Sequence, residues 1–326
     1  MKLSRIVLTG SLVFAAACGE TTAPPADTVS SGSNPSFLLG DVGQKVHIMP
    51  LNSNVWEAQA KAGPGGGGSG TGIFYHGGPI LVSPKAAAIY WGTSTIYNGG
   101  PAPGTNGSGG GDGSLVGYFL SNLGGSNYWG INNTYYDGSN NHVAKSLGYT
   151  QFYAANSAPP ASPTDADMQT LLTSAINGGK LALDASTVYA IFTGPGVNLG
   201  GGFGSQYCAY HGKFTINGTV VAYAAMPYDY DFVSGCTANL GSPNNDPAAD
   251  AEVNTLAHEL EEAATDVQLN AWYDRRGYEN ADKCAWTWGT TYKTSNGATA
   301  NMNFGSRDWL IQRNWKNSGS GGCFLS

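Results

Sequence analysis

The stretch from Asp246 to Asp266 constrains this chain more than any other, because it has the signals of one long helix. Asp246 is a suitable N-cap, and Pro247 suits the first helical position. Apolar residues recur at steps of three and four and form one face, made of Val253, Leu256, Ala257, Leu260, Ala263 and Ala264. A helix this rich in Ala and Leu is expected to be buried, and charges on a buried helix need partners.

The middle of this helix carries the motif His258-Glu259-x-x-Glu262. His258, Glu262 and Asp266 are four residues apart, so they share one stripe of the helix. The motif departs from the zinc-peptidase pattern H-E-x-x-H only at its last position. In that pattern the first and last positions hold the metal, and the Glu beside the first ligand is the general base. We therefore predict His258 and Glu262 as ligands and Glu259 as the base.

A second acidic group, Glu279-Asn280-Ala281-Asp282, follows the helix. In gluzincins a third, acidic ligand comes roughly 20 residues after the helix motif, and Glu279 lies at about that distance from His258. This spacing predicts Glu279 as the third metal ligand. Asp282 and Asp266 are expected to orient the ligands from the surrounding shell.

Several assignments stay open at this point. His211 is a candidate donor to the transition state, and His211 and Asp266 are both alternatives to Glu279 as third ligand. His211 could equally be a structural histidine beside a disulfide. One His with two carboxylates is a harder donor set than two His with one Glu, so zinc is the first expectation, with calcium or manganese as alternatives. An exposed helix also often carries His and Glu for solubility alone.

The N-terminus has the features of an export signal. A basic start is followed by the apolar run Ile6–Ala17, which is too short for a membrane span. The residues before Cys18 resemble a bacterial lipobox, in which Cys18 becomes the lipidated first residue of the mature chain. We expect an exported lipoprotein of the outer membrane or cell surface, touching the membrane only through its lipid. The alternative is ordinary cleavage near Ala17 and a secreted protein.

Export agrees with the cysteine count. The chain has five Cys. If Cys18 carries a lipid, four remain, which is enough for two disulfides. We predict Cys208–Cys236 and Cys284–Cys323, because this pairing keeps each bridge within one segment. A net charge of −7 and the lack of a basic patch in the sequence argue against a nucleic-acid partner.

Composition divides the chain into three parts: a signal with lipobox at 1–18, a Gly/Ser/Pro-rich tether at 19–72, and one domain at 73–326. The domain contains strand patterns at 86–92, 128–136 and 187–192, helix patterns at 115–123 and 165–176, and a hairpin with strands at 213–216 and 219–227 around Asn217-Gly218. Strands, helices and a hairpin followed by a His-Glu helix predict an α+β, zincin-like domain with a mixed sheet.

Five segments, in order, resemble the Exordium, or phosphate-induced protein, family. They are Tyr75-His76-x-Gly78-Pro79-Ile80-Leu81 with Ile89–Gly92, Val188–Thr193, Cys208-x-x-His211-Gly212, Gly305–Leu310, and the tail residues Trp315 and Cys323. The helix region is similar to bacterial secreted relatives that read H-E-x-x-E-A-x-T-D, then N-x-W-Y-D, then E-x-x-D-x-C; the matching residues are Asn270, Trp272, Tyr273, Asp274, Glu279, Asp282 and Cys284.

This resemblance implies secretion and the family's fold, and in plants the family is tied to growth and the cell wall without an established reaction. It does not by itself establish catalysis. Two functions therefore stay open. The first is a metal-dependent hydrolase, most simply a zincin-like peptidase, acting on an extracellular protein or cell-wall substrate. The second is a non-catalytic extracellular protein with a structural metal or acidic cluster, which could bind cell wall or glycan.

Overall fold

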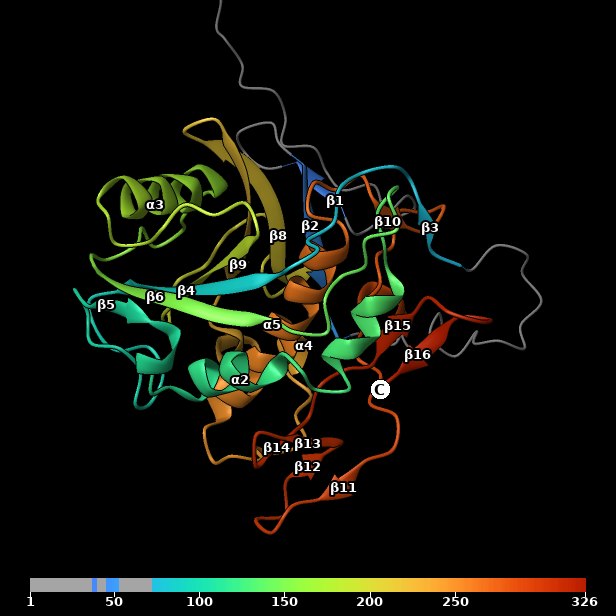
Figure 1. Cartoon of the computed structure of the whole chain (residues 1–326). Helices are drawn as coiled ribbons and strands as arrows, with labels where there is room; N and C mark the ends of the chain where they lie inside the picture. The colour runs from blue at the N-terminus through green and yellow to red at the C-terminus, as the bar shows by residue number, and fades with distance from the viewer. Residues whose placement is uncertain (1–36, 40–44, 53–71) are drawn as a thin grey trace, which may run out of the picture. The chain divides into compact units, whose positions relative to one another are not determined.

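The computed structural model describes residues 37–39, 45–52 and 72–326, and one eight-stranded mixed sheet organises this part of the chain (Figure 1). In spatial order its strands are β1 (Phe37–Leu39), β2 (Lys45–Pro50), β8 (Tyr207–Ile216), β9 (Thr219–Met226), β7 (Thr187–Thr193), β4 (Lys85–Gly92), β6 (Gly148–Asn156) and β5 (Asn106–Ser108).

The centre of the sheet is parallel and its edges are antiparallel. β6, β4, β7 and β9 run in one direction, whereas β8 runs against β9 and β2 runs against β8. The direction reverses at the β8–β9 hairpin, where Asn217 and Gly218 have φ values of 50° and 82°. Such left-handed values suit a two-residue hairpin turn, as the Asn-Gly pair predicted.

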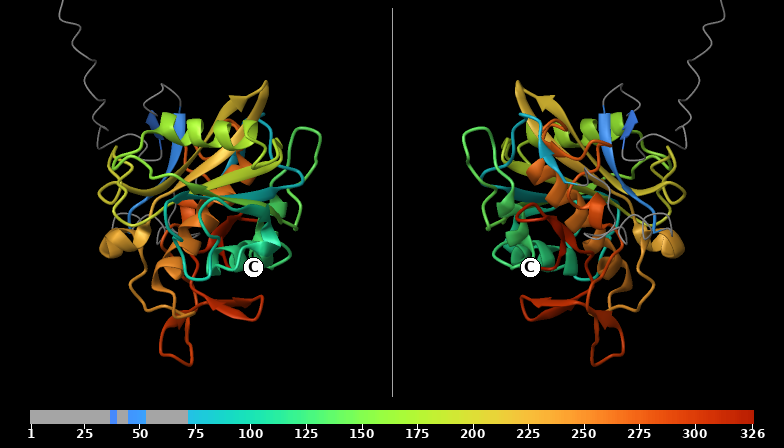
Figure 2. Two further views of the ribbon diagram at one scale, coloured as in Figure 1. Left: turned by 90° about the vertical axis from the view of Figure 1, so that its left-hand side faces the viewer. Right: turned by 90° about the vertical axis from the view of Figure 1, so that its right-hand side faces the viewer.

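Helices cover both faces of the sheet (Figures 1 and 2). They are α2 (Leu115–Leu123), α3 (Asp165–Asn177), α4 (Val233–Cys236) and α5 (Pro247–Thr265). α3 packs with one apolar cluster, which includes Ile89 and Tyr189 of the sheet. α2 and α5 pack with the other cluster, on the opposite face. α5 and α2 therefore pack against each other and against the same face of the sheet.

Short elements complete the described part of the chain. The two-stranded sheets are β3 (Phe74–Tyr75) with β10 (Trp272–Tyr273), β11 (Tyr292–Lys293) with β12 (Thr299–Ala300), β13 (Met302–Phe304) with β14 (Arg307–Trp309), and β15 (Asn314–Lys316) with β16 (Gly322–Phe324). The 3-10 helices are η1 (Gly109–Gly111), η2 (Trp129–Thr134), η3 (Asp229–Phe232) and η4 (Asp282–Cys284).

The predicted α5 forms from its own capping signals. The Asp246 side chain accepts a hydrogen bond from the backbone of Ala249, and Pro247 is the first helical residue. The predicted apolar face is buried against the sheet and α2. The polar residues from Glu252 to Thr265 are buried too, so α5 is a charged helix inside the core.

Most of the other local predictions are confirmed. The helix pattern at 115–123 is α2, and that at 165–176 is α3. Thr164 caps α3 and forms a capping box with Asp167. The strand patterns at 86–92 and 187–192 are β4 and β7, and both predicted disulfides are present. The class, a mixed α and β domain with a mixed sheet, is as predicted.

One strand prediction is wrong. The aromatic stretch 128–136 was expected to be a strand, but it contains the 3-10 helix η2, Trp129–Thr134. The Ser126 side chain accepts a hydrogen bond from the Trp129 backbone and starts this turn. Tyr128, Trp129 and Tyr135 are buried in the α5-side cluster, so these aromatic residues serve core packing without strand pairing.

Part of the predicted tether belongs to the sheet. Residues 45–50, inside the 19–72 range, form β2, and 37–39 form β1. The predicted signal, the lipobox with Cys18 and the Gly-rich stretch 63–70 lie outside the described residues. Within the described part, no helix has the length and apolar character needed to cross a membrane.

Candidate metal centre

Three histidines from three elements meet where α5 crosses β8 and β2. His47 lies on β2, His211 on β8 and His258 on α5. His47 and His211 are register partners across the two strands, and their ring centroids are 5.4 Å apart. Partners in register point to the same face of a sheet. That face is the one covered by α5, which brings His258 into the group.

Four carboxylates surround these rings. Glu259 and Glu262 come from α5, Glu279 comes from the segment before η4, and Asp282 is the first residue of η4. The three histidines and four carboxylates, here called the His-acid cluster, are each at most 3% exposed. Buried ionisable groups at this density need compensation by partners, protons or a cation.

The motif on α5 has the predicted local geometry. Nε2 of His258 lies 3.1 Å from Oε1 of Glu262, one helical turn away. Gln312, which the sequence analysis missed, approaches the ring from the other side: its Nε2 is 3.0 Å from Nδ1 of His258 and donates to the carbonyl of Ala281 at 3.1 Å. This amide holds the ring of His258 in the plane that faces Glu262.

The second acidic segment is fixed to α5 by its backbone. The backbone N–H of Asp282 donates to Oε1 of Glu262 at 2.9 Å, and the N–H of Glu279 donates to Oδ2 of Asp282 at 3.1 Å. The disulfide Cys284–Cys323 ties the end of η4 to β16. The segment is therefore held to α5 by a hydrogen bond and to β16 by a covalent bond.

The predicted ligands are distributed differently around the cluster than expected. Asp282, predicted as an orienting residue, is the acid beside His258, with Oδ1 at 3.5 Å from Nε2. Glu279, predicted as third ligand, contacts other rings: Oε1 is 3.2 Å from Nδ1 of His47, and Oε2 is 3.8 Å from Nε2 of His211. Both acids belong to the cluster, but Asp282 is the one in contact with the motif histidine.

His47 is the cluster member that the sequence analysis missed. Its Nε2 lies 2.7 Å from Oδ2 of Asp282 and 3.7 Å from Oε2 of Glu262. The sequence contains one signal for His47: Val46 and Ile48 on either side of it are apolar, and in a strand the residue between them points to the opposite face. Nothing local in the sequence indicates that this strand pairs with β8.

His211 contacts the predicted base. Its Nδ1 lies 2.9 Å from Oε2 of Glu259. The disulfide Cys208–Cys236 anchors the same strand, so His211 is also a histidine beside a disulfide, as the structural alternative predicted.

Asp266 lies at the C-terminal end of α5, where it accepts hydrogen bonds from the backbone N–H groups of Asn270 and Ala271 and shapes the following turn. Burial raises the pKa of Asp266 to about 6.

The pKa values of the carboxyl groups reflect their burial. Burial raises the pKa of Glu259 and Glu279 well above the usual range, and neighbouring carboxylates add to the shift of Glu279. Burial and the charge of Asp282 raise the pKa of Glu262. For Asp282, burial acts in the same direction, but His47 and His258 outweigh it and lower the pKa. Three of the four acids thus favour protonation.

The histidines divide into two kinds. Burial opposes charge on His258, but Glu262 and Asp282 outweigh it and raise the pKa of His258 well above the usual range. The pKa of His47 is raised in the same way, by Asp282 and Glu262 against burial. Burial, together with the charges of His47 and His258, lowers the pKa of His211 well below the usual range. A neutral imidazole such as that of His211 can bind a metal or orient a base.

Several buried cluster atoms have no hydrogen-bond partner in the described part of the chain. They include both carboxylate oxygens of Glu279, Oε2 of Glu262 and Nε2 of His211. Two sets of donor atoms lie within 4.8 Å of one another, namely His47, Glu262 and Asp282, and His211, Glu259 and Glu262. With bonds of 2.0–2.6 Å, donors this close can share one ion. The cluster therefore fits a divalent cation, and Glu262 belongs to both sets.

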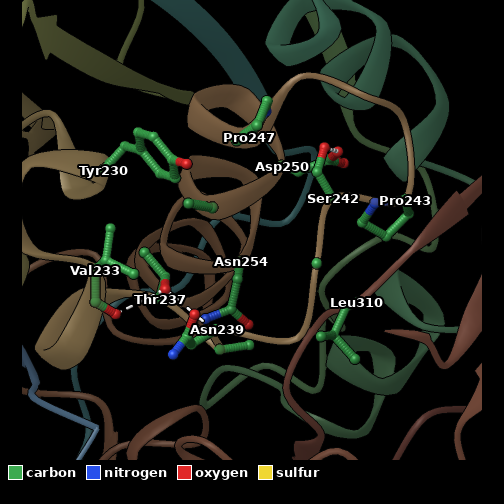
Figure 3. Close-up of a pocket in the computed structure, with 13 residues that line it drawn as sticks. Tyr230, Val233, Thr237, Asn239, Ser242, Pro243, Pro247, Asp250, Asn254 and Leu310 are labelled. Atoms are coloured by element: carbon green, nitrogen blue, oxygen red, sulfur yellow. Dashed lines mark hydrogen bonds between the residues drawn. The ribbon is translucent and has the colours of Figure 1, made fainter. Parts of the chain in front are cut away.

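A cavity of about 160 Å³ lies beside the N-terminal half of α5 (Figure 3). Its lining includes Tyr230, Asp250 and Asn254. Oδ1 of Asn254 accepts from the backbone N–H of Gln312, the residue that contacts His258. The lining contains no member of the His-acid cluster, so this cavity ends one turn of α5 short of it.

A family model, described as the phosphate-induced protein 1 conserved region, matches residues 122–307, more than half of the chain. The chain belongs to the phosphate-induced protein 1 family. The matched region contains every cluster member on β8, on α5 and before η4. His47 lies outside it. Comparison with curated proteins and with solved structures gave no match.

Proposed function

We propose that this member of the phosphate-induced protein 1 family is an exported, metal-dependent hydrolase, most simply a zincin-like peptidase. The observation that carries the proposal is the His-acid cluster, with buried carboxylate oxygens that have no donor in the described part of the chain. When these four acids are ionised together they repel one another, and a divalent cation removes that repulsion without protonating them. Zinc is the first candidate, with calcium or manganese as alternatives.

The ligand set is proposed from contacts. His258 and Glu262 are the pair on α5, and the acid nearest to them is Asp282. Asp282 is therefore preferred over Glu279 as the third ligand, with Glu279 as the alternative. When bound, the metal would polarise a substrate carbonyl and lower the pKa of a water molecule.

Glu259 is the proposed general base. It would take a proton from the attacking water and deliver it to the leaving amine, the role of the Glu in the H-E-x-x-H pattern. The imidazole of His211, 2.9 Å away, would hold the carboxylate in position. In this proposal His211 positions the base Glu259. For His211 to contact the transition state directly, as the sequence predicted, Glu259 would have to move.

The architecture is consistent with a zincin-like domain by analogy. β8 runs antiparallel to the parallel strands of the sheet, and the His-Glu helix α5 packs across the face of the sheet at β8. Two disulfides favour an oxidising compartment and hence export. Anchoring through Cys18, or secretion without an anchor, remains part of the proposal.

The alternative is a non-catalytic extracellular protein in which the same residues hold a structural ion, with a role in binding cell wall or glycan. One observation favours it: the cluster is at most 3% exposed. Structural metal sites are closed by protein ligands, whereas catalytic sites keep one position for water. Hydrolysis thus requires that a covering element leave the site.

The test is the substitution Glu259→Gln, which removes the base but none of the proposed ligands. We expect unchanged zinc content and a rate of cleavage of a mixed peptide library lowered by about 10²–10⁴-fold. The matched substitution Glu262→Gln should lower zinc content as well. If zinc binds but no peptide is cleaved in any state of the chain, including the one described below with β2 displaced, the non-catalytic function stands.

A further inference from the structure

One buried strand, β2, covers the His-acid cluster beside β8. β2 pairs antiparallel with β8 from Val46 opposite Gly212 to Pro50 opposite Tyr207. It precedes the conserved family region, which begins at residue 122. Between β2 and the rest of the described chain the sequence contains the run 63–70, composed of Gly, Pro and Ser.

β2 contacts the residues that would carry out hydrolysis. His47 approaches Asp282, Glu262 and Glu279 within 2.7–3.7 Å. The backbone of Met49 interacts with the carboxylate of Glu259, the proposed base. A single short strand therefore reaches both the proposed ligands and the base.

The opposite face of β2 fits an apolar surface. Val46 and Ile48 are each 3% exposed and join the apolar cluster on the α3 side of the sheet, as does Met49 beside the register shift at Met49/Pro50. β2 thus directs Val46 and Ile48 to the apolar cluster and His47, which lies between them, to the His-acid cluster. Strand addition to a sheet edge uses the same division, with main-chain bonds for affinity and alternate side chains for selectivity.

We propose that β2 occupies the binding place of an extended polypeptide substrate on β8. This inference rests on the proposed function and names its substrate class: unfolded or extended protein segments with apolar residues at alternate positions. Displacing β2 together with β1, which pairs with its other edge, exposes the hydrogen-bonding edge of β8 with Glu259 and Asp282. A polypeptide pairing antiparallel with β8 then lies across His211, in the register that His47 occupies.

The reaction on such a segment is ordinary hydrolysis of one peptide bond. The water oxygen bonds to the carbonyl carbon and the C–N bond breaks. The proton taken up by Glu259 passes to the leaving amine. With β2 in place, neither the edge nor the base is accessible, so the intact chain is the latent form.

The first test cuts the chain between β2 and the domain. A recognition site for a sequence-specific protease is inserted at Gly65–Gly68 of the full chain and cleaved after folding, so both pieces remain. The probe is a fluorescent peptide with the sequence of residues 45–50. We expect saturable binding of this peptide after cleavage, and at least tenfold faster hydrogen exchange of the β8 amides at 207–212. The same insertion left uncut is the control, as is a peptide carrying I48D.

The second test keeps the chain intact. Ile48→Ala weakens β2, and Ile191→Ala removes an equally buried isoleucine from β7 in the centre of the sheet. I48A should raise peptide binding and β8 exchange at least tenfold over I191A at matched stability. Equal behaviour of I48A and I191A, absence of peptide binding after cutting, or unfolding on cutting would each show that β2 is an integral strand and overturn the proposal.

The strand-addition site on β8 and the hydrolase function would be disproved by different results. Peptide binding to β8 without cleavage keeps the strand-addition site and removes the hydrolase. Peptide cleavage that does not depend on β2, with no binding of the 45–50 peptide, keeps the hydrolase and removes this substrate site.

Discussion

Two buried acidic sites in this molecule are built in opposite ways. The carboxylate of Asp112 receives the hydroxyls of Tyr90 and Tyr149 on Oδ2, at 2.5 and 2.7 Å, and the N–H and hydroxyl of Ser114 on Oδ1, at 3.0 and 2.7 Å. In the His-acid cluster, neither oxygen of Glu279 accepts a hydrogen bond from the described residues, and Oε1 has only the imidazole nitrogen Nδ1 of His47 at 3.2 Å.

The difference distinguishes a structural acid from a site that needs a cation. Where this fold buries a carboxylate for structure, as at Asp112, it supplies four donors. Around Glu262 and Glu279 it supplies further carboxylates and imidazoles instead, and the pKa of each of these two acids is raised by burial and by neighbouring charge. Such an arrangement is unfavourable without a cation and favourable with one.

The largest expected effects come from one matched pair of substitutions. In Asp112→Asn the amide N–H₂ faces two hydrogen-bond donors, so two charge-assisted hydrogen bonds are lost. At about 1.5–3 kcal/mol for each bond, the free energy of unfolding should fall by about 3–6 kcal/mol. Glu262→Gln in chelator should be neutral or stabilising, because burial and the charge of Asp282 outweigh the attraction of Glu262 to His258 and His47. Urea unfolding in EDTA measures both. A large loss for E262Q in EDTA would mean that the cluster is satisfied without metal.

Removing the bridge that holds the acidic segment should come next. The double substitution Cys284→Ser and Cys323→Ser should lower the free energy of unfolding by about 2–4 kcal/mol. It should also weaken zinc binding, because η4 carries Asp282. Calorimetric zinc titration at a temperature where the variant is folded separates the two effects. Unchanged zinc affinity would place the ion away from Asp282.

The pH dependence of stability tests a second acid on α5. Burial raises the pKa of Glu252 to about 8 from 4.5. A carboxyl group with a raised folded-state pKa adds stability below its unfolded pKa, and this stability is lost as pH rises through the folded value. Stability should therefore fall between about pH 4.5 and 8, and Glu252→Gln should flatten that fall. Thermal unfolding across this range, in chelator, measures the slope; an unchanged slope in E252Q contradicts the assignment.

The smallest effect is expected at Gln312, which contacts His258 but is not a proposed ligand. Gln312→Leu should weaken zinc binding by about tenfold, or about 1.4 kcal/mol, as loss of a residue that orients a metal-bound imidazole does. Competition with a chromophoric chelator measures the affinity. A change smaller than twofold would show that packing alone orients His258.

Local signals in the sequence predict what local physics decides. The capping residues and apolar spacing of α5, the Asn217-Gly218 turn and the two disulfides are all present in the structure. The motif on α5 also predicted the position of the cluster. These features depend on residues close in the sequence or on a count of cysteines.

What the sequence does not reveal are long-range pairings. His47 reaches the cluster because β2 pairs with β8, more than 150 positions later in the chain, and no local pattern encodes that choice. Gln312 reaches His258 from a loop between small strands. The exchange of roles between Glu279 and Asp282 depends on backbone bonds to Glu262 that spacing alone cannot show.

The most direct test of the account is the metal content of the folded chain. The wild type, Asp112→Asn and Glu262→Ala are dialysed against a common zinc buffer and analysed by plasma mass spectrometry. The account predicts about one ion per chain in the wild type and in D112N, and none in E262A. No ion in the wild type, or an equal ion content in E262A, would contradict the claim that the His-acid cluster is a metal centre.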